Sequence, residues 1–194
     1  ALGKATYEKQ CAACHGTDGT GNGPAAYLLY PKPRDFVSVR YRLMSTWDGL
    51  PTDDDLFLTI SRGMPGSAMP SWAHLPERTR WALVHHVKSF APEPIAIGSP
   101  TPENPKLGVI QIPPEPAYTE EVRAKASKLF AEGCAPCHGT TGKGDGVQKQ
   151  VDDKDYPTRP RDLTLGVYKG SPAPDKVYRR IVGGMPGTPM PSSA

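Results

Sequence analysis

The sequence of 194 residues predicts two small helical domains in tandem, joined by a proline-rich linker. A pentapeptide occurs twice, each copy follows a run of helix-forming residues, and the motifs after each copy match in kind and order. We expect the first domain at residues 1–91, the linker at 92–118 and the second domain at 119–194. A domain of fewer than about 100 residues buries only a modest apolar core, so a large apolar ligand would stabilise each half.

The repeated pentapeptide is Cys11-Ala12-Ala13-Cys14-His15, and its second copy is Cys134-Ala135-Pro136-Cys137-His138. The pattern C-x-x-C-H is the attachment signature of a c-type haem. Two thiols one helical turn apart can each add to a vinyl group of the macrocycle, and the following imidazole can then bind the iron. The two motifs contain all four cysteines, which leaves none for a disulfide. We therefore expect two covalently bound haem c groups, attached through Cys11, Cys14, Cys134 and Cys137, with His15 and His138 as iron ligands.

Two other uses of paired cysteines fit this pattern less well. The two pairs of a four-cysteine zinc site normally lie within about 15–20 residues of each other, whereas about 120 residues separate these pairs. A thioredoxin-like redox pair needs a strand and a helix around it, and neither copy has this context. The histidine directly after each pair also favours haem attachment.

The helices that lead into the two motifs each carry a small residue four positions before an aromatic one. Gly3 and Tyr7 form this pair in the first half, and Ala126 and Phe130 form it in the second. Residues four apart share one face of a helix, so we expect another helix to pack closely against this face.

A glycine-rich loop follows each histidine, at residues 16–23 and 139–146. A phosphate-binding loop would need the pattern G-x-x-x-x-G-K-[ST] after a strand, which neither loop has. Glycine instead allows the backbone to bend tightly past the histidine and to lie close to a flat ligand.

The segment Pro33-Arg34-Asp35-Phe36 recurs as Pro160-Arg161-Asp162-Leu163. A guanidinium group can bind a carboxylate through two parallel hydrogen bonds, and each haem carries two propionate carboxylates. We predict that Arg34 and Arg161 neutralise propionates, which would raise the reduction potentials. The alternative is a plain surface ion pair with the neighbouring aspartate.

Further helices are predicted at residues 52–63, 76–90 and 175–184, the first of them capped by Thr52 with three aspartates in its first turn. The helix at 76–90 has no counterpart in the second half, where four residues follow Met190. We therefore expect the second domain to lack its C-terminal helix, so that either a longer chain or another chain covers Ala126 and Phe130.

The helices at 52–63 and 175–184 each lead into an irregular loop that holds two methionines, at residues 64–70 and 185–191. A thioether in such a loop can be the second axial ligand of a haem iron. We favour Met69 and Met190, which lie further from the helix ends, and keep Met64 and Met185 as alternatives. Three histidines near the helix at 76–90 are expected to be surface or rim residues and not ligands: His74, His85 and His86.

The linker is rich in proline, with eight prolines between Ala91 and Tyr118. Prolines this dense favour an extended, semi-rigid chain. Such a linker would hold the two domains at a set separation while wrapping across them.

The series of C-x-x-C-H, glycine-rich loop, Pro-Arg-Asp and Met-Pro resembles a tandem pair of class I cytochrome c domains, over nearly the whole chain outside the linker. The resemblance implies an all-α fold in which each domain encloses one haem, ligated by histidine and methionine, with one haem edge exposed. It also implies that a proline carbonyl near Pro24 accepts a hydrogen bond from His15 and strengthens this ligand. Val147 stands at the corresponding place in the second loop.

With both axial positions filled, the iron has no open site for oxygen or peroxide, and a one-electron couple of relatively high potential remains. The expected function is a periplasmic electron carrier, not an enzyme, whose redox donor and acceptor dock weakly at the exposed haem edges. The alternatives are the cytochrome part of a larger redox enzyme and a di-haem peroxidase, in which one haem must be able to open.

Charge and hydropathy exclude two other classes of partner. The formal net charge of +3 is too small to argue for nucleic acid, and no apolar run approaches the roughly 20 residues of a membrane span. Because the sequence starts at Ala1 and goes straight into a helix, we interpret it as an exported chain whose signal peptide has been removed.

Overall fold

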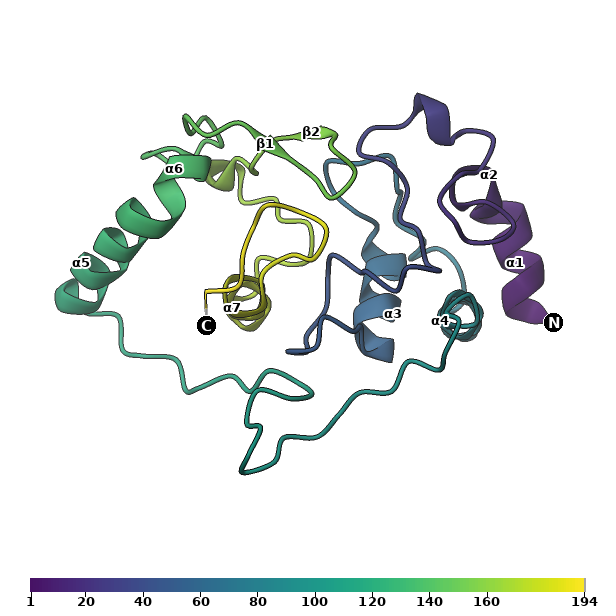
Figure 1. Ribbon diagram of the computed structural model, residues 1–194, viewed down its shortest axis with the longest axis horizontal. Coiled ribbons are helices and arrows are strands. Elements are labelled where there is room, and N and C mark those ends of the chain that lie inside the picture. Colours follow the sequence, from purple (N-terminus) through teal and green to yellow (C-terminus); the bar gives the residue numbers. More distant parts are fainter. Residues whose placement is uncertain (194) are drawn as a thin grey trace.

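The computed structural model describes residues 1–193 and consists of helices joined by long irregular segments (Figure 1). Helices α1 and α4 lie at one end of the molecule and α5 at the other, and the linker runs along one edge between α4 and α5. In chain order the elements are α1 (Leu2–Gln10), α2 (Ala12–His15), the 3-10 helix η1 (Ala26–Leu28), α3 (Asp53–Arg62), α4 (Glu77–Lys88), α5 (Glu120–Leu129), the π-helix η2 (Phe130–Cys134), α6 (Ala135–His138), β1 (Gln150–Val151), β2 (Pro157–Thr158), the 3-10 helix η3 (Leu163–Leu165) and α7 (Pro174–Gly183).

Helix α1 packs closely against α4, as the sequence predicted. Gly3 on α1 lies against the backbone carbonyl of Ala82 on α4, where no side chain would fit. Tyr7, one turn further along α1, is 1% exposed and packs against Phe90. Its hydroxyl donates a hydrogen bond to the carbonyl of Gly16 (2.8 Å). The helix pair therefore closes one side of the core of the first domain.

Helix α3 begins where the sequence predicted, because Thr52 caps it. The Thr52 hydroxyl accepts a hydrogen bond from the Asp55 N–H (3.1 Å), and the Asp55 carboxylate accepts one from the Thr52 N–H (3.0 Å). Leu56 and Ile60 are buried in the core. The helix ends at Gly63, whose φ of 71° suits glycine, and the chain then enters the first methionine loop.

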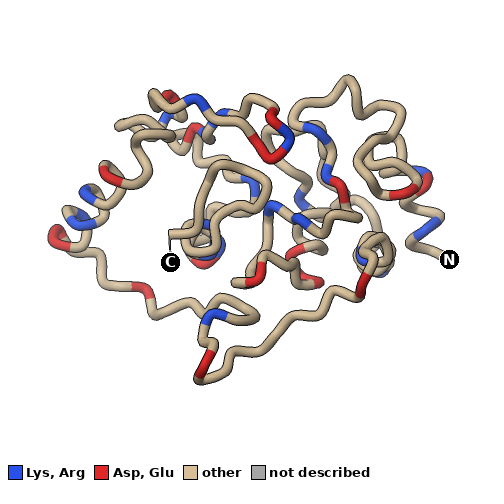
Figure 2. The backbone as a smooth tube through the Cα atoms, in the orientation of Figure 1, with Lys and Arg blue, Asp and Glu red and all other residues tan. Residues whose placement is uncertain are grey.

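Helix α5 of the second domain has no helix packed across it. Every residue of α5 is exposed, and within residues 1–193 its main packing contact is with η2, which continues it. Its acidic residues lie in the first turn and its basic residues follow them along the helix (Figure 2). Phe130, the counterpart of Tyr7, is only half-buried. The face that α4 covers in the first domain is thus uncovered on α5 in the described part of the chain.

A short antiparallel sheet of β1 and β2 departs from the all-α prediction. The turn between the strands is built on Asp152, whose carboxylate accepts hydrogen bonds from the N–H groups of Lys154 (3.0 Å) and Tyr156 (3.1 Å). Asp155 has a positive φ of 61°, which aspartate tolerates better than most residues. The aspartate-rich run therefore makes a tight turn that brings two short extended segments together.

The linker is fixed to the first domain near its middle. Thr46 and Val109 form an isolated β-bridge, and the adjacent Ile110 donates a hydrogen bond from its N–H to the carbonyl of Ser45 (2.8 Å). The side chain of Ile110 is fully buried, at 0% exposed. The linker is thus anchored by backbone pairing and by an apolar side chain, in addition to the stiffness of its prolines.

Helix α7 of the second domain packs at the same point. Gly183 allows α7 to come close to the side chains of Ile110 and Met44. Arg180, on α7, donates hydrogen bonds to the carbonyls of Arg42 (3.0 Å) and Met44 (2.8 Å). Met44, the one methionine outside the two loops, is 1% exposed. The two domains and the linker therefore share one apolar contact.

Replacing Gly3 by alanine should destabilise the first domain, because the new methyl group would overlap the Ala82 carbonyl. Overpacking at such a contact typically costs about 1–3 kcal/mol. The free energy of unfolding, measured by denaturant titration followed by circular dichroism, should fall by about this amount.

The matched control is Gly133→Ala in η2, where an added methyl group meets no atom within 4 Å. Alanine is a better helix former than glycine, so stability should stay unchanged or rise by about 0.5–1 kcal/mol. Equal effects of the two substitutions would contradict the close contact between α1 and α4.

Candidate functional site

The first C-x-x-C-H motif lies where α1 meets α2. Cys11 ends α1 and precedes α2, and Cys14 and His15 lie at the end of α2. The chain leaves α2 through Gly16, whose φ of 78° suits glycine. Gly21 then donates a hydrogen bond from its N–H to the carbonyl of His15 (2.8 Å). The glycine-rich loop therefore folds back onto the end of α2.

A single cavity in the first domain is lined by both this motif and the first methionine loop. Cys11, Cys14 and His15 line it, and so do Met64 and Met69. An apolar cavity that presents two thiols and an imidazole suits a flat hydrophobic macrocycle that is attached covalently. The apolar side chains in its lining include Phe36, Leu56, Ile60, Trp72, Leu83 and Val87.

The imidazole of His15 is oriented by a backbone carbonyl. Its Nδ1 lies 3.0 Å from the carbonyl oxygen of Arg34, so Nδ1 carries the proton and donates it, and Nε2 is left as the ligand atom. The ring of Phe36 stacks on the imidazole, with 4.6 Å between the ring centroids. Burial lowers the pKa of His15 below its ordinary value. The imidazole is therefore neutral at pH 7, which is the form that can bind iron.

The acceptor for His15 is not the carbonyl near Pro24 that the resemblance implied. The preceding residue, Gly23, packs against the backbone of Ala13 in α2 so tightly that no side chain would fit. This part of the loop therefore lies against the helix, and the carbonyl of Arg34 takes the place that was expected for a proline carbonyl.

The second C-x-x-C-H motif spans η2 and α6 and repeats this arrangement. Cys134 ends the π-helix, and Cys137 and His138 lie in α6. The Nδ1 of His138 lies 3.4 Å from the carbonyl oxygen of Arg161. Val147, the residue that corresponds to Pro24, is 92% exposed. In both domains the Pro-Arg-Asp segment therefore supplies the carbonyl that faces the histidine.

The two methionine loops have the same hydrogen-bonded conformation. In the first loop the N–H of Met64 donates to the carbonyl of Met69 (3.1 Å). The Ser67 hydroxyl donates to the Met64 carbonyl (2.7 Å) and accepts from the Met69 N–H (3.3 Å). The second loop repeats each bond, with Thr188 in place of Ser67 and its own two methionines in the matching places. This conformation is therefore a property of the repeat.

Both methionines of the first loop remain candidate ligands, because Met64 and Met69 both line the cavity. The histidines near α4 are not among the lining residues, and within residues 1–193 His15 is the one histidine of this cavity. His86 packs instead against the ring of Tyr7, with 5.0 Å between centroids.

The two arginines predicted to bind propionates lie at the contact between the domains. Arg34 lines the cavity, and its Nη1 lies 3.8 Å from Oδ2 of Asp153 in the second domain. The guanidinium of Arg34 also lies against Gly187 in the second methionine loop. Conversely, the guanidinium of Arg161 lies against Gly66 in the first methionine loop. Each arginine therefore reaches the methionine loop of the other domain.

Two buried donors in the cavity lining have no hydrogen-bond partner among the described residues, the hydroxyl of Tyr41 and Nε of Arg42. Burial raises the pKa of Tyr41 above its ordinary value, so its hydroxyl keeps its proton. An unpaired buried donor costs free energy, and the carboxylates of a haem would supply acceptors. The cavity thus fits a covalently bound haem. Neither residue lies in a motif, so no sequence pattern pointed to them.

Comparisons with known proteins agree with this fit. Residues 1–87 match the family described as cytochrome c oxidase, cbb3-type, subunit III, and residues 123–193 match the cytochrome c family. The chain is similar to a chain of the Kuenenia stuttgartiensis reducing HAO-like protein complex Kustc0457/Kustc0458. The TM-score is 0.84 and the sequence identity 37%, over 98% of this chain and 86% of that chain. No curated protein sequence matches.

The chain therefore belongs to the c-type cytochromes. More particularly, its two cytochrome c domains give it the architecture of a tandem di-haem cytochrome. Domains of this kind hold haem c covalently and transfer electrons. Among residues 1–193, none of the helices combines the length and the apolar character needed to cross a lipid bilayer.

Met69→Ala should abolish the near-infrared methionine–iron band of one oxidised haem, because the thioether ligand of the first domain is removed. The corresponding band of the second domain should remain. Near-infrared absorption of the oxidised protein measures both bands.

Met64→Ala is the matched control, since it removes the same atoms from the same cavity lining. It should leave both bands in place. If the band is lost in Met64→Ala and kept in Met69→Ala, the ligand is Met64.

Proposed function

We propose that this protein is a periplasmic electron carrier, which passes single electrons between redox partners through two c-type haems ligated by histidine and methionine. One observation carries the proposal: the C-x-x-C-H motif and a methionine loop line the same cavity. The repeated loop conformation in the second domain supports a second site of the same kind. The expected ligand pairs are His15 with Met69 and His138 with Met190.

A bound haem supplies a one-electron iron couple at each site. The residues that line the cavity orient the ligand of the iron and influence the reduction potential of this couple. The carbonyl of Arg34 holds His15 in one tautomer and orientation, which makes the imidazole a stronger and better-ordered ligand. Leu56, Leu83 and Val87 exclude water from the cavity, and a low dielectric disfavours the oxidised state with its extra positive charge. Both effects tune the potential of the couple.

We propose a carrier in preference to an enzyme in its own right. A di-haem peroxidase needs one haem whose methionine is displaced or absent. Both loops here hold two methionines in the same hydrogen-bonded conformation. With a methionine on each iron, neither haem has an open coordination position for oxygen or peroxide, which favours electron transfer alone.

The carrier is proposed to act as the cytochrome part of a larger redox assembly. The similar chain, at 37% identity, belongs to a reducing HAO-like protein complex, which supports partner chains as electron donor or acceptor. We assign the uncovered face of α5 to a helix of such a partner, because α4 covers the corresponding face of α1. The periplasmic location rests on thioether attachment of haem, which takes place outside the bacterial cytoplasm in the proteins that this chain resembles.

The intact protein should carry two covalent haems, and after reduction it should bind carbon monoxide only slowly at both, because each iron already has two protein ligands. Mass spectrometry counts the haems, and visible absorption follows the binding. Rapid stoichiometric binding at one haem would indicate an open, enzyme-like site. A mass with a single haem would contradict the di-haem proposal.

A further inference from the structure

The second domain contributes one charged side chain to the cavity of the first. Among the residues that line this cavity, Lys169, which follows η3, is the only one from beyond the linker. Arg34 and Arg42 of the first domain line the same cavity. Positive charges from both domains therefore meet at the border of one site.

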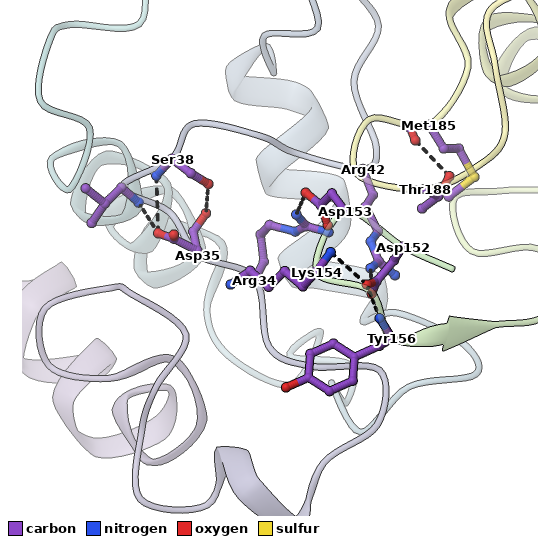
Figure 3. A network of polar contacts seen from close by, with 11 residues as sticks. Arg34, Asp35, Ser38, Arg42, Asp152, Asp153, Lys154, Tyr156, Met185 and Thr188 are labelled. Atoms are coloured by element: carbon purple, nitrogen blue, oxygen red, sulfur yellow. Dashed lines mark hydrogen bonds and ion pairs between the residues drawn. The ribbon is translucent and has the colours of Figure 1, made fainter. Parts of the chain in front are cut away.

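The two arginines are paired only in part. In Figure 3, Arg34 and Arg42 extend toward the turn between β1 and β2. Arg42 Nη2 lies 3.4 Å from Asp152 Oδ2, and Arg34 Nη1 lies 3.8 Å from Asp153 Oδ2. Nε of Arg42 is buried and has no acceptor among the described residues. The two aspartates thus leave one buried donor, Nε of Arg42, without an acceptor in the described part of the chain.

The ammonium group of Lys169 has neither an ion pair nor a hydrogen bond within residues 1–193. Burial, and then the charges of Arg42, Arg161 and Arg34, lower the pKa of Lys169 to about 8. A half-buried ammonium among other cations is unfavourable unless an anion compensates it. The surroundings of Lys169 therefore call for an anion that the chain itself does not supply.

We propose that Lys169 and Arg42 together bind a propionate of the haem in the first domain, so that the second domain sets the reduction potential of the first haem. This inference rests on the proposed function, because it requires a haem in the cavity. A propionate would compensate the ammonium charge and accept a hydrogen bond from the free Nε of Arg42. One anion thus accounts for two unsatisfied groups from different domains.

The sign of the change in the reduction potential of the first haem follows from the positive charge of Lys169. The reduced haem carries one more negative charge than the oxidised haem, so a nearby cation favours reduction and raises the potential. Lys169 reaches the site only while the two domains are in contact. The contact between the domains is thus coupled to the potential of the first haem.

The test replaces Lys169 in the full holoprotein. Lys169→Gln removes the charge, and at a fixed ambient potential the oxidised-to-reduced ratio of the first haem should rise about tenfold, which is about 59 mV for a one-electron couple. Lys169→Arg keeps the charge and should stay close to the wild-type potential. Spectroelectrochemical titration gives both couples, and Met69→His, which changes one ligand, identifies the couple of the first domain.

A second readout separates propionate binding from a merely structural role. The propionate bending band in the resonance Raman spectrum depends on hydrogen bonding to the carboxylate. It should shift in Lys169→Gln, whereas loss of a simple packing contact would leave it in place.

The matched control is Lys125→Gln on α5, which removes the same charge from an exposed position of the same domain. It should change neither the first couple nor the Raman band. An equal shift in Lys125→Gln, or an unchanged first couple and Raman band in Lys169→Gln, would overturn the inference. The proposed function fails separately, if the wild-type protein lacks two covalent haems or their methionine bands.

Discussion

The hydrogen bond between the imidazole of His15 and the carbonyl of Arg34 is the contact on which the first site depends. It ties the end of α2 to the Pro-Arg-Asp segment and leaves Nε2 free for iron. For the carbonyl to reach the ring, this segment must pass directly against the glycine-rich loop, and Gly21 lies so close to the Pro33 carbonyl that a side chain would collide with it. Gly144 has the same relation to Pro160 in the second domain. Close backbone packing is thus sufficient to require glycine at these two positions.

The same segments also join the two domains. The ion pair of Arg42 with Asp152 is nearly enclosed, with side chains 10% and 7% exposed, and loss of one partner would leave a buried charge uncompensated. Arg180 adds hydrogen bonds to two carbonyls of the first domain, one of them that of Arg42. Because each Pro-Arg-Asp arginine also reaches the opposite methionine loop, the two sites share one electrostatic environment. The tandem arrangement is therefore one packed unit around Met44 and this group of charges.

Features governed by a few neighbouring residues could be predicted from the sequence. The cap at Thr52 and the close approach at Gly3 follow from local rules, and the chemistry of C-x-x-C-H holds in any fold. Contacts between distant segments that no helical spacing marks were not predictable, which is why the acceptor for His15 was wrongly placed and Lys169 was overlooked. The β1–β2 sheet was missed for another reason: strands of two residues give no alternation to detect, although the aspartates at 152–155 mark a turn.

Helix α5 has ten residues, and helices shorter than about 12–15 residues are marginal in water on their own. Helix α5 is held by η2 at its C-terminal end, so the stability of its N-terminal turns depends on whatever packs against them. Backbone amides in those turns should exchange hydrogen for deuterium far faster than those of α1. Cys134 ends η2, the segment that anchors α5, so the second haem can be attached while the N-terminal turns of α5 are still frayed. With the partner helix proposed above, assembly and not haem attachment would be the event that makes the second domain rigid.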